Sequence, residues 1–263
     1  MIMRTNHDIK HQAYNLATKY FSKLFLLLCM PLLLIILGSL FVGISSKALG
    51  VIGMIAILIG SFVSLGAMWY IAEALQNPEA IKKRSFKDCF SIFHGSTWVN
   101  VLVLAIEYYL LYFGASLAVL LVALIGMSIH WTVGMVLMIV GYCAIILLNV
   151  YISYAYLIVL DAGKHFPGSH LDYSSFYYED GTFFGAWKLG WAAIKKSIKL
   201  MKGHFWKNVG LEFSLIGWIF LSFLIFPLIF VFPYFVAVEV NWYLDLTKED
   251  AVEAETPTID MPA

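Results

Sequence analysis

The chain of 263 residues is 61% hydrophobic, 16% aromatic and only 13% charged, and its formal net charge is zero. A soluble domain of this length cannot bury so much apolar surface, so the composition excludes a soluble globular protein and predicts an integral membrane protein. The cysteines Cys29, Cys89 and Cys143 are far apart and lack metal-ligand spacing, so we expect them to be reduced packing residues.

The N-terminal part predicts a polar segment followed by a helical hairpin. Residues 1–23 are polar and basic, and the apolar run after them is as long as a full span, without a convincing signal-peptide cleavage site. Spans are predicted over about 24–44 and 49–72. The second span carries small residues three and four positions apart, a seam that lets another helix approach closely: Gly53, Ala56, Gly60, Ser64 and Ala67.

A second hairpin is predicted over spans 98–125 and 131–160, the latter long enough to tilt or protrude. In the polar connection before it, residues 76–97, one helical face gathers Phe86, Cys89, Phe90 and Phe93, which predicts a short interfacial helix. The polar stretch after it, 161–184, has turn and cap residues rather than helical periodicity. We expect a connecting loop there, and a binding loop is the alternative.

Residues 187–202 have the pattern of a basic amphipathic helix. At about 100° per residue, one narrow sector contains Trp187, Trp191, Ile194, Ile198 and Met201. One flank of that sector carries Lys188, Lys195, Lys199 and Lys202, and Lys196 lies opposite. This pattern is typical of a helix in the membrane interface, with aromatic rings at the acyl boundary and lysines toward anionic head groups.

The apolar stretch from Val209 to Trp242 is too long for one crossing, since it would extend over ~51 Å against a ~30 Å hydrocarbon core. We predict two short spans, 208–225 and 228–244, that fold as a hairpin near Phe226 and Pro227. The tail, 247–263, is acidic and contains proline, which predicts disorder. Residues 1–246 therefore form a single transmembrane domain.

The predicted fold is all-α: a polytopic transmembrane helical bundle of six spans, in three hairpins, with basic interfacial helices before the third and fifth spans. Lysine and arginine number four in the N-terminal segment, four in residues 76–97 and seven in residues 161–207. The turn after the first span holds one basic residue, Lys47, and the turn after the third span holds no lysine or arginine. The positive-inside rule therefore places both termini in the cytoplasm.

Two of the hairpins begin alike. Residues 90–101 align with 198–209, so that Gly95 matches Gly203 and Trp98 matches Trp206, followed by a matching Asn and Val. Glycine ends a helix with little strain, and tryptophan anchors at the head groups. We interpret both glycines as helix joints where the chain turns from the membrane plane into a span. Chance similarity between short apolar segments is the alternative.

The C-terminal part resembles a family of bacterial integral membrane proteins. The resemblance rests on Ser197, Met201-Lys202-Gly203-His204, Ser214, Gly217-Trp218, Pro233-Tyr234 and Tyr243. The family is known as domain of unknown function 975. It implies a six-span protein of the bacterial plasma membrane and supplies no activity. Its last hairpin usually turns on glycines, whereas this chain has Phe226-Pro227-Leu228.

The sequence contains no nucleophile elbow, phosphate-binding loop, zinc-protease motif or dinucleotide fingerprint, so we expect no catalytic residue, no metal ligand and no cofactor. The candidate polar residues lie within predicted spans: Glu107, Asn149, Glu212 and Glu239. Glu107 lies ~13 Å along its helix from Trp98, where it should face protein or water rather than lipid. Such residues either bond helices together or conduct a proton or cation.

Two functions therefore remain open. The first is a non-catalytic membrane protein that binds lipid or a partner protein, as an accessory to transport, secretion or envelope-stress resistance. The second is a small proton- or cation-coupled transporter that uses the buried carboxylates, although clear broken-helix signals are lacking. The expected partners are membrane lipid and a protein partner or second copy of the chain, and nucleic acid is not expected.

Overall fold

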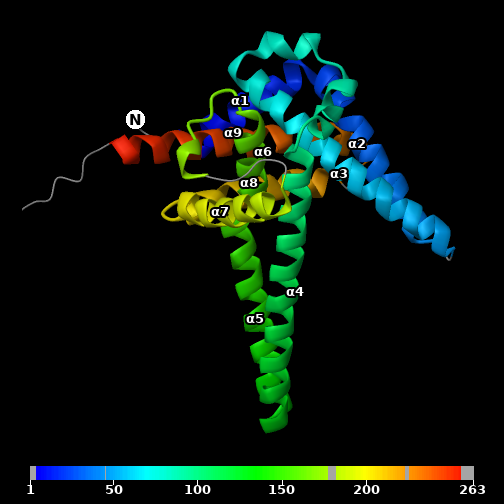
Figure 1. Cartoon of the computed structure of the whole chain (residues 1–263), viewed down its shortest axis with the longest axis vertical. Helices are drawn as coiled ribbons and strands as arrows, with labels where there is room; N and C mark the ends of the chain where they lie inside the picture. Colours follow the sequence, from blue (N-terminus) through cyan, green and yellow to red (C-terminus); the bar gives the residue numbers. More distant parts are fainter. Residues whose placement is uncertain (1–3, 45, 177–181, 223–224, 256–263) are drawn as a thin grey trace, which may run out of the picture. The chain divides into compact units, whose positions relative to one another are not determined.

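The computed structural model describes residues 4–44, 46–176, 182–222 and 225–255, and within them the side chains outside 175, 216–229 and 253–255. These residues form helices without a strand (Figure 1). The α-helices are α1 (Asn6–Lys19), α2 (Phe21–Val42), α3 (Lys47–Gln76), α4 (Thr97–Ile129), α5 (Trp131–Ile152), α6 (Ala155–Lys164), α7 (Phe183–Met201), α8 (Phe205–Ser222) and α9 (Ile225–Glu255). The 3-10 helices are η1 (Pro78–Lys83), η2 (Phe86–Phe93) and η3 (Tyr173–Ser175).

Four stretches of the described residues are long and apolar enough to cross a membrane: α2, α3, α4, and α5 together with α6. Their mean hydropathies lie between 2.4 and 2.8, yet only 6 to 22% of each apolar window is buried inside the protein. Side chains this apolar are stable in such exposed positions when lipid is the solvent. The described residues thus confirm the all-helical fold, and the four stretches that are long and apolar enough to cross a membrane lie where the first four spans were predicted.

Two compact units make up the chain. The first comprises Met1–Trp98, Leu160–Ser175 and Gly210–Ala263, and the second comprises Val99–Val159 and Phe176–Val209. In the first unit, α2 and α3 lie side by side as a hairpin (Figure 1). Gly38 and Gly53 face each other where these helices cross, and a Cβ at Gly38 would lie 2.6 Å from the Gly53 carbonyl oxygen. Gly53 and Gly60 of the predicted small-residue seam thus pack on α2.

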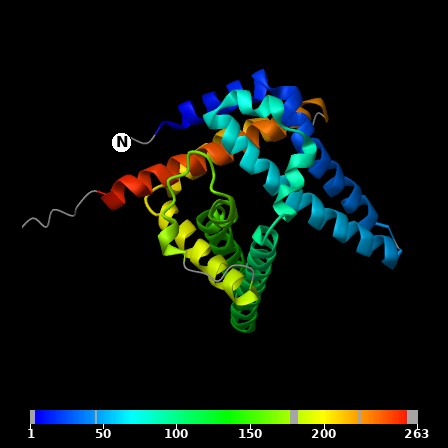
Figure 2. The same ribbon diagram turned by 45° about the horizontal axis from the view of Figure 1, so that its top comes forward.

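Helix α9 packs on α1, α2 and α3 of the first unit, and α1 runs alongside it in the opposite direction (Figure 2). Arg4 Nε lies 2.7 Å from Asp245 Oδ1, Asn241 Nδ2 donates to the Ile9 carbonyl at 3.1 Å, and the Tyr14 ring contacts that of Tyr234. The outer face of α1 is exposed and polar, with His7, Asp8, His11, Asn15 and Lys19. Such a face belongs in water or at the membrane surface, so the adjoining part of α9 is buried by protein rather than by lipid.

In the second unit, α4 and α5 form a long antiparallel hairpin, and α7 lies crosswise over its base (Figure 1). The distal parts of both hairpin helices carry exposed apolar side chains such as Leu121, Ile125 and Val136. Helix α7 packs near the end of α5, where Ser197 Oγ donates to the Tyr151 carbonyl at 2.8 Å. The crosswise helix is therefore held to the hairpin by side-chain contacts and not only by its connection along the chain.

The structure corrects the predicted C-terminal region. The turn expected at Phe226 and Pro227 falls inside α9, which tolerates proline in its first turn because the first helical N–H groups have no intrahelical acceptor. Helix α9 also continues to Glu255, so the predicted disordered tail is helical over its first nine residues, 247–255. Thr247 anchors this extension, since its hydroxyl donates to Leu244 and accepts from the His170 N–H. Residues 256–263 lie outside the described residues.

Other differences are smaller. The connection 76–97 forms η1 and η2 rather than an α-helix, with Cys89 and Ile92 buried. The fourth predicted span is interrupted by a turn at Ser153 and Tyr154, which separates α5 from α6. Of the polar stretch 161–184, the described residues after α6 pack inward through Phe166, Leu171 and Phe176.

Candidate functional site

Helix α7 has three distinct faces. The face packed inside the protein consists of small and aliphatic residues: Ala186, Leu189, Gly190, Ala193, Ile194, Ser197, Leu200 and Met201. The structure thus places Ile194 and Met201 of the predicted aromatic sector in the protein interior, whereas Trp191 and Ile198 are 40% and 38% exposed. The pattern alone missed this division because residues at the edge of a helical sector can turn either to protein or to lipid.

The remaining surface of α7 is basic. Lys188, Lys195, Lys199 and Lys202 are exposed, and Trp187 is half-buried beside Trp191. The lysines lie next to the Trp191 and Ile198 stripe and away from the packed face. A helix with one face on protein, one apolar exposed stripe and one row of lysines matches the physics of a membrane-surface helix.

Glycines with positive φ end the elements that precede α4 and α8. Gly95 has φ +81° between η2 and α4, and Gly203 has φ +96° between α7 and α8. No atom lies within 4 Å of a Cβ built at either position, so backbone conformation rather than crowding favours glycine there. The residues that follow also agree in burial: Trp98 and Trp206 are exposed, while Asn100 and Asn208 are buried.

Glu107 and Asn100 lie on the same face of α4 and are buried, with 2% and 1% of their surface exposed. Within the described residues, none of the four polar side-chain atoms of this pair has a hydrogen-bond partner. Burying an unpartnered carboxyl is costly, so such a position requires water, a proton or a ligand. Two turns of helix, ~10 Å, separate the pair.

The Glu107 carboxyl lies against Gly190 of α7. A Cβ at residue 190 would overlap Glu107 Oε2, so the glycine leaves the space that the carboxyl occupies. The helix that carries the exposed lysines therefore also covers the buried carboxyl of Glu107. The small residues that recur on this face of α7 are the sequence signal for the contact.

Asn149, the candidate polar residue of the fourth predicted span, accepts from the Tyr112 hydroxyl at 2.5 Å. The Tyr108 hydroxyl donates to the Ile152 carbonyl. These bonds join α4 to α5. Tyr108 stacks on Tyr156 with ring centroids 4.8 Å apart. Asn149 is thus a structural contact between helices.

Glu212 and Glu239 belong to the first unit, whereas Glu107 belongs to the second. Glu212 is exposed on α8 and Glu239 is half-buried on α9, and the two are close enough for their charges to interact. The structure therefore brings these two carboxyls together as a pair of their own.

A cluster around Asp161 was not predicted. Asp161 is fully buried and accepts hydrogen bonds from the Phe166 N–H at 2.6 Å, from the Tyr173 and Tyr243 hydroxyls at 2.7 Å each, and from Ser169. Burial and the Asp161 carboxylate raise the pKa of Tyr173, which keeps its hydroxyl protonated as a donor. The cluster ties the segment after α6 to α9, and it gives Tyr243 of the resembled pattern a structural role.

In the described part of the chain, no three His, Cys, Asp or Glu side chains gather as possible ligands of a metal ion. The arrangement is that of an α-helical membrane protein with a basic crosswise helix above a buried carboxyl. A family model described as a protein of unknown function, DUF975, matches residues 2–250, and the chain belongs to this family. Comparison with curated proteins and with solved structures gives no match.

Proposed function

We propose that this protein is a non-catalytic component of the bacterial plasma membrane that binds anionic lipid through α7. The three-faced division of α7 is the observation that supports the proposal most. Its packed face fixes the helix to the α4–α5 hairpin. Its exposed tryptophan and lysines therefore lie together on the surface that faces away from the hairpin. Each lysine near an anionic surface contributes about 1 kcal/mol of attraction, so four act as a strong combined contact.

The topology we propose has α2–α3 and α4–α5 as crossing hairpins, with both termini cytoplasmic. In this topology the third predicted hairpin does not consist of two full spans. Helix α9 begins at Ile225, and the Phe230 ring already lies 6.0 Å from the rings of Tyr14 in α1 and Phe21 in α2. Five residues of α9, ~8 Å, precede this contact with the polar α1, against a ~30 Å core. We therefore place α8 and the start of α9 as a hairpin that enters and leaves on the cytoplasmic side.

Thermal unfolding in nanodiscs tests the lipid proposal. The wild type should melt at a higher temperature with phosphatidylglycerol than with phosphatidylcholine, because a ligand that binds the folded state stabilises it. Replacing Lys188, Lys195, Lys199 and Lys202 together with glutamine should abolish this difference. Lys47→Gln, at the first residue of α3, is the control for loss of a lysine elsewhere. An unchanged lipid difference in the quadruple variant would refute the assignment to α7, and a stoichiometric co-purifying protein would favour a protein partner.

Transport of a proton or cation is a second candidate, and the unpartnered Glu107 and Asn100 favour it. A buried carboxyl in a membrane-spanning helix is a functional candidate by default. Glu107→Gln retains size and hydrogen-bonding capacity but cannot titrate. Proton-coupled uptake by wild-type proteoliposomes that is lost in Glu107→Gln, at equal thermal stability, would establish transport. Loss of stability without any uptake by the wild type would leave Glu107 as a structural residue.

A further inference from the structure

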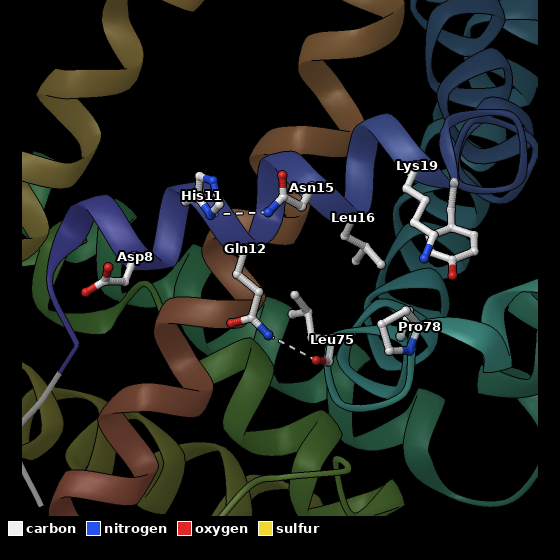
Figure 3. A pocket seen from close by; sticks show the side chains of 10 residues that line it. Asp8, His11, Gln12, Asn15, Leu16, Lys19, Leu75 and Pro78 are labelled. Carbon is white, nitrogen blue, oxygen red and sulfur yellow. Dashed lines mark hydrogen bonds between the residues drawn. The ribbon is translucent and has the colours of Figure 1, made fainter.

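Buried polar groups without partners are rare in proteins, and Glu107 in the second unit is such a group. In a pocket of about 430 Å³ beside α1 in the first unit, by contrast, polar side chains are bonded to neighbours (Figure 3). Gln12 donates to the Leu75 carbonyl at 3.0 Å, and the Asn15 amide lies 3.2 Å from His11 Nδ1. Both carboxyl oxygens of Glu107 lack a hydrogen-bond partner among the described residues. The surroundings of Glu107 therefore decide what this carboxyl can bind.

Glu107 lies where α4 changes from a buried to an exposed helix. Leu104, one turn before it, is buried, whereas Tyr109 and Leu110 after it are 70% and 50% exposed. From Glu107 to Ile129, the end of α4, the helix extends over 22 residues, ~33 Å, which matches the ~30 Å hydrocarbon core. In the proposed topology, Glu107 is therefore near the cytoplasmic boundary of the membrane core and not at its centre.

Helix α7 covers Glu107 with small apolar residues. Gly190 lies against the carboxyl, and Ala186 and Ala193, one helical turn to either side, are buried on the same face. The lysines of α7 and of its C-cap all point at least ~120° away from Gly190 at ~100° per residue: Lys188, Lys195, Lys196, Lys199 and Lys202. No cation on α7 therefore faces the carboxyl.

The hairpin also places no cation against Glu107. Its titratable groups nearby are tyrosines: Tyr108 adjoins Glu107 in α4 and stacks on Tyr156 of α6. The Tyr108 hydroxyl donates to the Ile152 carbonyl, so it is not directed to the carboxyl. A carboxylate without a partner is costly to bury, so the packed arrangement favours the protonated acid. If the proton leaves, water must reach the carboxylate beneath α7.

The contacts of α7 make it the helix that moves. Tyr112 bonds to Asn149 and holds α4 to α5. Helix α7 covers Glu107 with apolar side chains, and Ser197, which donates a hydrogen bond to the hairpin, is ~10 Å farther along the helix than the contact at the carboxyl. The glycine joint at Gly203, with φ +96°, follows directly after α7 and its C-cap. A few residues at the end of an element are sufficient for a hinge.

We propose that Glu107 is a proton-binding site under α7, which makes the packing of α7 on the α4–α5 hairpin respond to pH. This inference rests on the function proposed for α7, because it names the regulation of the same surface helix. With the proton bound, α7 lies on the hairpin and its lysines are held at the membrane surface. Because the packed arrangement binds one more proton than the open one, a rise in pH favours opening.

Double electron–electron resonance tests this proposal with spin labels on exposed positions, Leu110→Cys of α4 and Lys195→Cys of α7, in the otherwise cysteine-free full chain. The protein is reconstituted in phosphatidylcholine nanodiscs. At about pH 5 we expect one distance between the labels. At about pH 9 we expect a second distance that is longer by at least ~3 Å, the diameter of the water that must enter. Glu107→Gln should show the shorter distance at both pH values.

Asn100→Leu is the matched control, because it removes the other unpartnered buried side chain of α4 without removing a titratable group. It should retain the response of the wild type. Circular dichroism checks that both variants fold, and the wild-type comparison decides if one does not. Phosphatidylcholine carries no net charge, so failure here is separate from failure of anionic lipid binding. An unchanged distance in the wild type, a response that persists in Glu107→Gln, or one that Asn100→Leu also abolishes would overturn the proposal.

Discussion

At the scale of single residues, the reactivity of Cys89 measures whether the packing around η2 in the first unit is intact. Its thiol is buried in η2 and donates to the Leu27 carbonyl at 3.6 Å. Burial raises the pKa of Cys89 from its ordinary value of 9.0 to about 12. Because the folded state holds the protonated thiol, this group supports the fold below pH 9 and ceases to do so as the pH rises toward 12.

We therefore predict that Cys89, in a Cys29→Ser, Cys143→Ser background, reacts with a maleimide at pH 8 only after unfolding in dodecyl sulfate, since the thiolate is the reactive form. The measurement is the rate of mass increase. Fast labelling of the native protein at this pH would mean that the packing around η2 is open.

Tyr243 tests the Asp161 cluster. Tyr243→Phe removes one hydrogen bond to a buried carboxylate, for which we expect a loss of roughly 1.5–3 kcal/mol in the free energy of unfolding. Tyr109→Phe is the matched control, because Tyr109 is 70% exposed. Equal stability of the two variants would show that the Asp161 contacts add little to the fold.

At the scale of elements, the joint at Gly203 is the feature that depends most on one residue. Its φ of +96° is unfavourable for a residue with a Cβ, and alanine there should cost ~1–2 kcal/mol. Gly50→Ala is the control, since Gly50 lies in α3 with open space around a Cβ and helical alanine is favoured by ~0.5–1 kcal/mol. Denaturation of both variants in detergent measures the difference. A neutral Gly203→Ala would indicate that the joint does not require this conformation.

Element boundaries divide into those that sequence could predict and those that it could not. Apolar runs bounded by polar turns located α2 to α5, and the glycines before Trp98 and Trp206 marked where α4 and α8 begin. The role of α1 could not be found in this way, because its buried face of Ile9, Ala13, Leu16 and Ala17 is small and its partner lies more than 200 residues away. The same long-range contact explains why the apolar α9 was predicted as a full span.

The sequence allowed us to predict which residues belong to the candidate site, but not how they contact one another. Depth along the helix singled out Glu107, and lysine spacing singled out α7. Their contact through Gly190 depends on how α7 crosses the α4–α5 hairpin, which no local pattern contains. The partner of Asn149 was not predictable for a related reason, because several tyrosines could reach it and the packing of α5 selects Tyr112.

At the scale of the whole molecule, topology is open to direct test. Single cysteines at Lys47 and Ser128 should react with an impermeant thiol reagent in intact cells, whereas one at Lys83 should react only after permeabilisation, because the basic connections face the cytoplasm. Lys83 is exposed on η1, so lack of labelling there would reflect its side of the membrane rather than burial. Labelling of Lys83→Cys in intact cells would reverse the proposed orientation.

In the function we propose, α7 rests on the membrane with Trp191 toward the acyl chains and its lysines toward the head groups. The most direct measurement attaches an environment-sensitive fluorophore to Trp191→Cys or Lys199→Cys in the otherwise cysteine-free full chain, reconstituted in phosphatidylglycerol-containing bilayers. We expect blue-shifted emission and quenching by a lipid-soluble quencher at position 191, with quenching by aqueous iodide at position 199. Equal and purely aqueous quenching at both positions would contradict it.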